Sequence, residues 1–246
     1  HVADYMFKDV PQANEDEDAI ERTINAMDNN GVNIGLVTLM GTRAPAAAKA
    51  HPDRFLLCSP IDPNDVMGAV TKIREDHETH GIRAVSFFPA GCDPHVPIDD
   101  AKTYPIYATC VELDLPIFVN AGVPGPRVIG ESQNVSRFDP VCYDFPELKI
   151  VMRHGAEPDE ALAVKLMLKW PNLHYSTSAF APKYYPTAII DYANTRGADK
   201  IIYAGYFPMG LHIDTIFEQL PNVPFRDHVW PQFLRENAMR VLKLES

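Results

Sequence analysis

The chain has 246 residues, of which 46% are hydrophobic and 22% charged, and its formal net charge is -11 at pH 7. This composition excludes a disordered protein, and no apolar run is long enough to cross a bilayer. Because nucleic-acid affinity depends on clustered Lys and Arg, the acidic balance argues against a nucleic-acid partner. The length suits one large domain, which we expect to span residues 1–246.

The cysteines do not form a metal or redox motif. The chain contains Cys58, Cys92, Cys110 and Cys142, which lie far apart and make no C-x-x-C pair. We therefore expect reduced, mostly buried thiols. The residues at hand contain no apolar leader and no lipidation signal, so the predicted compartment is the cytoplasm.

Strand-like runs and helix-like runs alternate along the chain. A first helix is predicted at residues 13–30, where Asn14 can cap it and the acidic residues 15–18 load its first turn. Apolar, β-rich runs begin at residues 32, 55, 82, 116, 149, 173 and 201. Further helices are predicted in an alanine-rich stretch that ends at residue 49 and at residues 65–80, 104–113, 140–145, 160–169, 187–196, 213–220 and 231–242. Such alternation implies parallel strands joined by right-handed crossovers.

The number of strands indicates a barrel. Seven strands can be found after residue 31, and an eighth would fall at or before His1-Val2-Ala3. A closed barrel leaves no exposed sheet edge, whereas a barrel that lacks one strand has two. We therefore predict an α/β fold of the TIM-like (β/α)8 barrel type, with a first strand that is incomplete or truncated in this chain.

Three candidate catalytic residues lie where predicted strands end. The apolar run at residues 149–152 leads directly to His154, Asn120 closes the run that begins at residue 116, and Tyr206 follows the last run. Barrels of this type build their sites at the carboxyl ends of the strands. If these side chains point inward they converge, with His154 as general base or acid and with Asn120 and Tyr206 polarising a carbonyl. The alternative is a core histidine satisfied by a backbone carbonyl.

Four further residues are candidates for substrate binding. Arg153 has the opposite strand parity to His154, so it either packs against a neighbouring loop or reaches a substrate carboxylate. Arg127, in the Gly/Pro-rich loop 122–130, either clamps an anion or is solvated. Ser178 and Phe88 stand at strand ends and complete the candidate set.

Several short motifs are distributed along nearly the whole chain. They are His51-Pro52-Asp53-Arg54-Phe55, Tyr104-Pro105-Ile106-Tyr107, Phe145-Pro146-Glu147-Leu148, His154-Gly155 and Glu236-Asn237-Ala238-Met239-Arg240. In order and spacing the chain resembles the amidohydrolase-related branch of the amidohydrolase superfamily, the group that includes aminocarboxymuconate-semialdehyde decarboxylase. The resemblance implies a TIM-like barrel that holds a divalent metal through an H-x-H, a histidine and an aspartate.

The chain departs from this pattern at the metal-ligand positions. The histidine of the family falls on Asn120, the aspartate falls on Tyr206, and Ala3 stands where the second histidine of the H-x-H would be. An amide and a phenol are poor ligands for zinc or manganese, and a catalytic site normally needs about three protein ligands. The sequence therefore predicts no metal and no cofactor.

The leading functional hypothesis is a metal-independent hydrolase that acts on a small carbonyl or carboxylate compound, an ester or lactone rather than an amide. Two alternatives stay open: a decarboxylase of a small carboxylate, for example an aromatic one, and a catalytically silent barrel that serves as a binding or assembly subunit. We also expect a homodimer or larger homo-oligomer. The proline-rich tail at residues 220–231, with Phe225, Trp230 and Phe233, is predicted to offer apolar surface for it.

Overall fold

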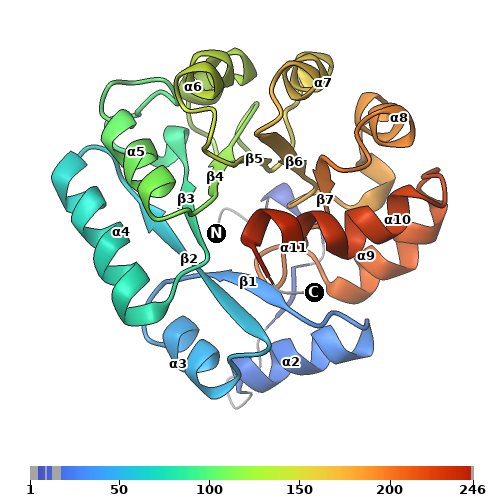
Figure 1. The fold of residues 1–246 in the computed structure, drawn as a ribbon. Coiled ribbons are helices and arrows are strands. Elements are labelled where there is room, and N and C mark those ends of the chain that lie inside the picture. Colours follow the sequence, from blue (N-terminus) through green and yellow to red (C-terminus); the bar gives the residue numbers. More distant parts are fainter. Residues whose placement is uncertain (1–4, 9, 13–17, 245–246) are drawn as a thin grey trace.

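Figure 1 shows a computed structural model of the chain, in which one parallel sheet curls round and helices cover its outside. The structure describes residues 5–8, 10–12 and 18–244. Within these residues, seven strands pair in chain order, each parallel to the next. They are β1 (Gly35–Thr38), β2 (Phe55–Ile61), β3 (Ala84–Phe87), β4 (Ile117–Asn120), β5 (Ile150–Arg153), β6 (Leu173–Ser176) and β7 (Ile201–Ile202).

Helices follow the strands on the outside of the sheet, and capping residues fix several of their ends. The Asp65 side chain accepts a hydrogen bond from the N–H of Gly68 (2.9 Å) at the start of α4. Asp18 caps α2 in the same way, whereas the predicted cap Asn14 lies outside the described residues. The α-helices are α2 (Ala19–Asn29), α3 (Arg43–Ala50), α4 (Val66–His80), α5 (Tyr104–Glu112), α6 (Phe138–Asp144), α7 (Glu160–Lys169), α8 (Thr187–Thr195), α9 (Ile213–Gln219), α10 (Val229–Pro231) and α11 (Asn237–Leu242).

The C-terminal helix α11 covers one end of the ring (Figure 1). Its Val241 packs with Phe118, Val151 and Ile202, which point to the inside of the sheet. Val151 and Phe118 lie in the first half of their strands, so α11 closes the amino-terminal end of the barrel. The carboxyl-terminal end is left for the site.

The predicted strand starts at residues 32, 55, 82, 116, 149, 173 and 201 fall within three residues of the observed starts. The structure therefore confirms the α/β fold of TIM-like barrel type. In the described part of the chain, β1 pairs with β2 and β7 with β6, and no pairing joins β1 to β7. The predicted eighth strand at or before residues 1–3 lies outside the described residues.

The proline-rich tail does not expose the apolar surface that the sequence suggested. Phe225 and Phe233 are buried, and their rings pack 5.1 Å apart at the centroids, with Trp230 5.2 Å from Phe225. That premise of the oligomer prediction is wrong, because the aromatic side chains complete the chain's own core. A homodimer or larger assembly stays a prediction.

One prediction about residue environments is confirmed. All four cysteines are free and buried. No helix among the described residues combines the length and apolar character needed to span a membrane.

Candidate active site

A cavity of about 1050 Å³ opens among the loops that follow the strands. Its wall is largely apolar and includes six aromatic side chains, a composition typical of small-molecule sites. The aromatic residues that line it are Phe7, Phe87, Phe88, Phe180, Tyr184 and Tyr206. Polar groups reach it from Thr38, Asp62, Ser86, Asn120, Gln133, Arg153, His154 and Glu157.

Arg153 faces into the barrel, and strand register shows why. Val151 is the partner of Phe118 and Arg153 is the partner of Asn120 on adjacent parallel strands. Phe118 and Val151 pack together inside the ring, so Asn120 and Arg153, two residues further along, point to the same face. Of the two readings of Arg153, the structure favours the one in which it reaches the cavity.

His154 reaches the cavity by a different route from the one predicted. Strand alternation would place His154 on the side of Met152, and Met152 belongs to the large core cluster that also includes Leu166 and Met167 of α7. His154 lies just beyond β5 and has a φ of +62°. Left-handed backbone of this kind turns the chain at the strand end, and for a non-glycine residue it costs about 1–3 kcal/mol. The turn brings the imidazole to the inner side next to Arg153.

Ser178 holds the imidazole from behind. Its Oγ accepts a hydrogen bond from the backbone N–H of His154 (3.1 Å) and lies 2.9 Å from Nδ1 of the ring. Because Nδ1 is used in this way, Nε2 is the ring nitrogen that is free to meet a ligand. Ser178 is thus a support for His154 and is not itself part of the cavity wall.

The charge state of His154 follows from its surroundings. Burial and, next, repulsion from the Arg153 guanidinium lower the pKa of His154 to about 3, although a backbone hydrogen bond with Ser178 opposes the shift. The imidazole is therefore neutral at pH 7. A histidine with so low a pKa is a weak base, because an efficient general base has a pKa near the working pH.

Tyr206 and Asn120 complete the predicted trio. The Tyr206 ring lies edge to face against His154, with centroids 5.1 Å apart and an interplanar angle of 81°. The Asn120 Oδ1 is buried and has no hydrogen-bond partner in the described part of the chain. The amide Nδ2 is therefore the atom of this side chain that reaches the cavity. The structure thus brings His154, Asn120 and Tyr206 together around one cavity.

The remaining predicted residues are placed differently. Phe88 lies in the cavity wall. Arg127 is not among the lining residues: its guanidinium stacks over the Tyr5 ring, 4.5 Å from the centroid. Among the described residues, Arg153 is the candidate arginine that faces the cavity.

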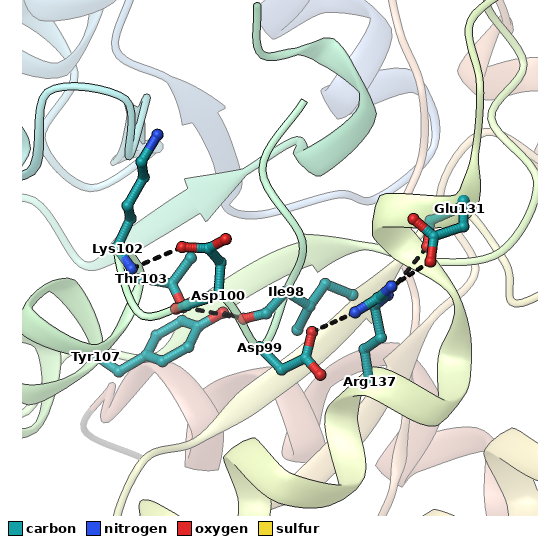
Figure 2. A network of polar contacts seen from close by, with 8 residues as sticks. All are labelled: Ile98, Asp99, Asp100, Lys102, Thr103, Tyr107, Glu131 and Arg137. Atoms are coloured by element: carbon teal, nitrogen blue, oxygen red, sulfur yellow. Dashed lines mark hydrogen bonds and ion pairs between the residues drawn. The ribbon is translucent and has the colours of Figure 1, made fainter. Parts of the chain in front are cut away.

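A polar network braces the loops at the rim (Figure 2). Arg137 bonds Asp99 (2.6 Å) and also pairs with Glu131, which joins the loop after β3 to the loop after β4. The Ile98 carbonyl accepts from Tyr107 Oη (2.6 Å) and from Thr103 Oγ1 (3.0 Å). These loops carry lining residues, so the network fixes part of the cavity wall. Asp99 is thus a structural acid that holds its loop through Arg137.

The residues present do not fit the divalent metal that the family resemblance implies. Nowhere in residues 5–8, 10–12 and 18–244 do three or more His, Cys, Asp or Glu side chains gather closely enough to hold a metal ion. The strand ends offer one imidazole, one amide and one phenol, and two of these are poor ligands. His1 and Ala3 lie outside the described residues. We derive no step through a metal.

Sequence reasoning missed several lining residues. Met6 and Phe7 lie outside every predicted helix and strand, and no local pattern marks them as part of a site. Gln133 and Cys92 come from loops. Thr38 and Ser86 could have been found, because they lie near the carboxyl ends of β1 and β3 on the inward parity.

The fold is that of a TIM-barrel protein, and its cavity lies at the carboxyl ends of the strands, where enzymes of this fold carry their active sites. A profile of the amidohydrolase family matches residues 3–244, which is nearly the whole chain. The chain belongs to the amidohydrolase family, and the resemblance seen in its motifs is confirmed. A search of curated protein sequences found no match.

Solved structures show the same fold at low sequence identity. An uncharacterised TIM-barrel protein from Bordetella bronchiseptica is 23% identical, with a TM-score of 0.86 over 98% of this chain and 88% of that one. A 2,6-dihydroxybenzoate decarboxylase from Rhizobium is 16% identical, with a TM-score of 0.75 over 93% and 90% of the two chains. A 5-carboxyvanillate decarboxylase from Sphingomonas paucimobilis is 16% identical, with a TM-score of 0.72 over 93% and 84%.

Proposed function

We propose that this protein is a carboxy-lyase that removes CO2 from a small, aromatic carboxylate. The observation that carries the proposal is the Arg153 guanidinium, which faces a largely apolar cavity with six aromatic side chains in its wall and has no carboxylate partner among the described residues. An arginine that is left without an anion in a partly buried site is suited to receive one from a ligand.

The neighbouring side chains suit the charge that develops as CO2 leaves. Arg153 pairs with the carboxylate, while Asn120 Nδ2 and the neutral His154 lie on the same side of the cavity. His154 donates through Nε2 when its Nδ1 accepts from the Ser178 hydroxyl. Donors fixed in a site that excludes water stabilise a developing oxyanion strongly.

The proposed decarboxylation needs no reagent besides water. The bond between the carboxylate and its carbon breaks and CO2 leaves. For an aromatic substrate, a proton first moves from the ortho-hydroxyl group, by way of water, to the carbon that carries the carboxylate, which gives the keto form. The electron pair of the breaking bond then passes to the keto oxygen, restores the aromatic ring and leaves a phenolate. The phenolate takes a proton from water, so a carboxylate and water give the decarboxylated compound, CO2 and hydroxide. His154 and Asn120 hydrogen-bond the oxygen that gains the charge.

The structural neighbours support this choice over hydrolysis. Two of them are named as decarboxylases of hydroxylated benzoates. Hydrolysis needs a base that activates water, and burial together with Arg153 lowers the pKa of His154 to about 3, too low for that role near neutral pH. A metal-independent hydrolase of an ester or lactone remains the second candidate, because the same donors would stabilise a tetrahedral intermediate.

A substrate panel with gas-phase detection of CO2 tests the proposal. The panel contains 2-hydroxybenzoate, 2,6-dihydroxybenzoate and 5-carboxyvanillate, with phenyl acetate as an ester. We expect CO2 from at least one acid, and a loss of about 100-fold or more in His154→Ala and Asn120→Ala, the size found when one oxyanion donor is removed. Ester hydrolysis without CO2 release would replace the lyase with the hydrolase. No turnover of any compound would support the silent barrel.

A further inference from the structure

Three residues near the start of the described chain form a wall of the candidate active site. Met6 and Phe7 line the cavity, and Tyr5 precedes them. We name residues Tyr5, Met6 and Phe7 the strap. They lie at the carboxyl ends of the strands, beside loops that are more than one hundred residues away in sequence.

One end of the strap is fixed to the loop after β4. The Tyr5 Oη accepts a hydrogen bond from the backbone N–H of Arg127 (3.0 Å). The Arg127 guanidinium lies over the Tyr5 ring at 4.5 Å from its centroid, within the range of a cation–π contact. The structure thus gives Arg127 a role in holding the strap.

The other end of the strap reaches the proposed catalytic residues. The Phe7 ring lies 5.6 Å from the Tyr206 ring, and Tyr206 in turn lies edge to face against His154 at 5.1 Å. Pairs at such distances contribute about 0.5–1.5 kcal/mol beyond their buried area. Phe7 therefore packs directly behind the side chain that contacts His154.

Two glycines make room for the strap. A Cβ at Gly125 would lie 2.1 Å from Met6 Cε, and a Cβ at Gly210 would lie 2.3 Å from Phe7 Cε2. Neither glycine has a positive φ, so an alanine fits the backbone at both positions and only the strap is in its way. Both close approaches exist because these residues lack a Cβ.

We propose that the strap is the specificity-determining wall of the cavity, where Met6 and Phe7 limit the size of the substituent that a bound ligand can carry. The proposal rests on the proposed function only in taking a carboxylate as the ligand. Apolar pockets of this kind discriminate by about 10- to 200-fold for a methylene group. Removal of a whole side chain from the wall is therefore expected to change selectivity by at least that much.

Labelling of Cys92 tests the wall without any substrate. Cys92 lines the same cavity, and burial, then the nearby Asp62, raise its pKa to about 12, so it reacts slowly in the intact protein. We expect a bulky maleimide to label Cys92 about tenfold faster or more in Met6→Ala and Phe7→Ala. Cys110, which is buried and does not line the cavity, is the internal control in peptide mapping.

The glycines give a second set of variants that keep the strap residues themselves. Gly125→Ala and Gly210→Ala should displace Met6 and Phe7 and speed Cys92 labelling in the same direction. Gly35→Ala is the matched control, because its Cβ would meet nothing nearer than 3.7 Å and its φ is not positive. Unchanged labelling of Cys92 in all four test variants would overturn the proposal.

Calorimetric binding of benzoate and 1-naphthoate tests the size limit. The ratio of the naphthoate Kd to the benzoate Kd should fall by about tenfold or more in Phe7→Ala and stay constant in Gly35→Ala. An equal change for both acids would overturn size selection. If neither acid binds any variant, the carboxylate chemistry of the proposed function fails, while the Cys92 result still decides whether the strap is a wall.

Discussion

Replacement of Arg153 by methionine tests the proposed anion site most directly. Methionine keeps much of the length and apolar contact of the arginine stem and removes the charge. Hydrogen bonds to a charged group are worth about 1.5–3 kcal/mol each. The methionine variant loses one such bond outright, and within the described part of the chain no second arginine or lysine lines the cavity to replace it. We therefore expect binding of 2,6-dihydroxybenzoate to weaken by about 2–3 kcal/mol, or about 30- to 150-fold.

Resorcinol, which is the same ring without the carboxylate, makes the test specific. Its affinity should change little in Arg153→Met, because the lost bonds go to the carboxylate alone. Isothermal titration of both ligands against wild type, Arg153→Met and Arg153→Lys gives the comparison, and lysine should restore part of the affinity as a point charge without the planar fork. Arg83→Met, at an exposed residue outside the cavity, is the control.

The same variant has a second expected effect. Since repulsion from Arg153 contributes to the low pKa of His154, the pKa should rise above about 3 in Arg153→Met when followed by NMR. The reasoning about the site is refuted if resorcinol and 2,6-dihydroxybenzoate lose affinity equally, or if neither does. Equal losses would show that Arg153 supports the cavity wall and does not bind the carboxylate.

Four further predictions concern stability, metal content and assembly. Burial, then repulsion by Lys200, lower the pKa of His174 to about 3, so the unfolded chain binds a proton at this residue near pH 6.5 and the folded protein does not. The free energy of unfolding should therefore fall by about 2 kcal/mol for this residue between pH 7 and pH 5. Denaturant titrations of His174→Gln should show a flatter pH dependence than wild type, and an identical slope would contradict the assignment. Tyr107→Phe removes the 2.6 Å hydrogen bond to the Ile98 carbonyl and should lower the free energy of unfolding by about 1–2 kcal/mol in urea titrations (Figure 2). An unchanged free energy of unfolding would argue against a role for the rim network. Elemental analysis should find no stoichiometric transition metal, and one equivalent that a chelator removes together with activity would overturn the site assignment. Light scattering should return a homodimer or larger assembly, and a species near 27.5 kDa would contradict that expectation.

Local sequence determined the elements of the fold. Short apolar runs with β-branched residues are too short for helices, and such runs became strands, including β4 (Ile117–Asn120) and β5 (Ile150–Arg153). The predicted helix at residues 65–80 differs from α4 by one residue, and Asp65 and Gly81 bound it, since a carboxylate caps free N–H groups and Gly81 takes a left-handed φ of +60°. The order of these elements also implied parallel pairing, because each crossover needs a helix.

The orientation of the site residues was decided by the tertiary structure. Alternation along β5 is readable from sequence, but which of its faces points inward depends on the packing of Val151 against α11 and of Met152 under α7. That choice gave Arg153 the inward position. His154 does not follow the alternation of β5, because its positive φ turns the backbone at the end of the strand. A histidine keeps such a φ only when the surrounding structure imposes it.

Contacts between distant segments also lay beyond the sequence. Met6 and Phe7 reach the cavity because Gly125 and Gly210 leave room for them, and these partners are separated by more than one hundred residues. The position of the aromatic tail around Phe233 also depends on such contacts. Its composition suggested an exposed surface, whereas Phe233 is buried in the core. Residue type and spacing thus determine which elements form, and long-range packing determines which side chains meet, because a local pattern carries no information about what lies across the barrel.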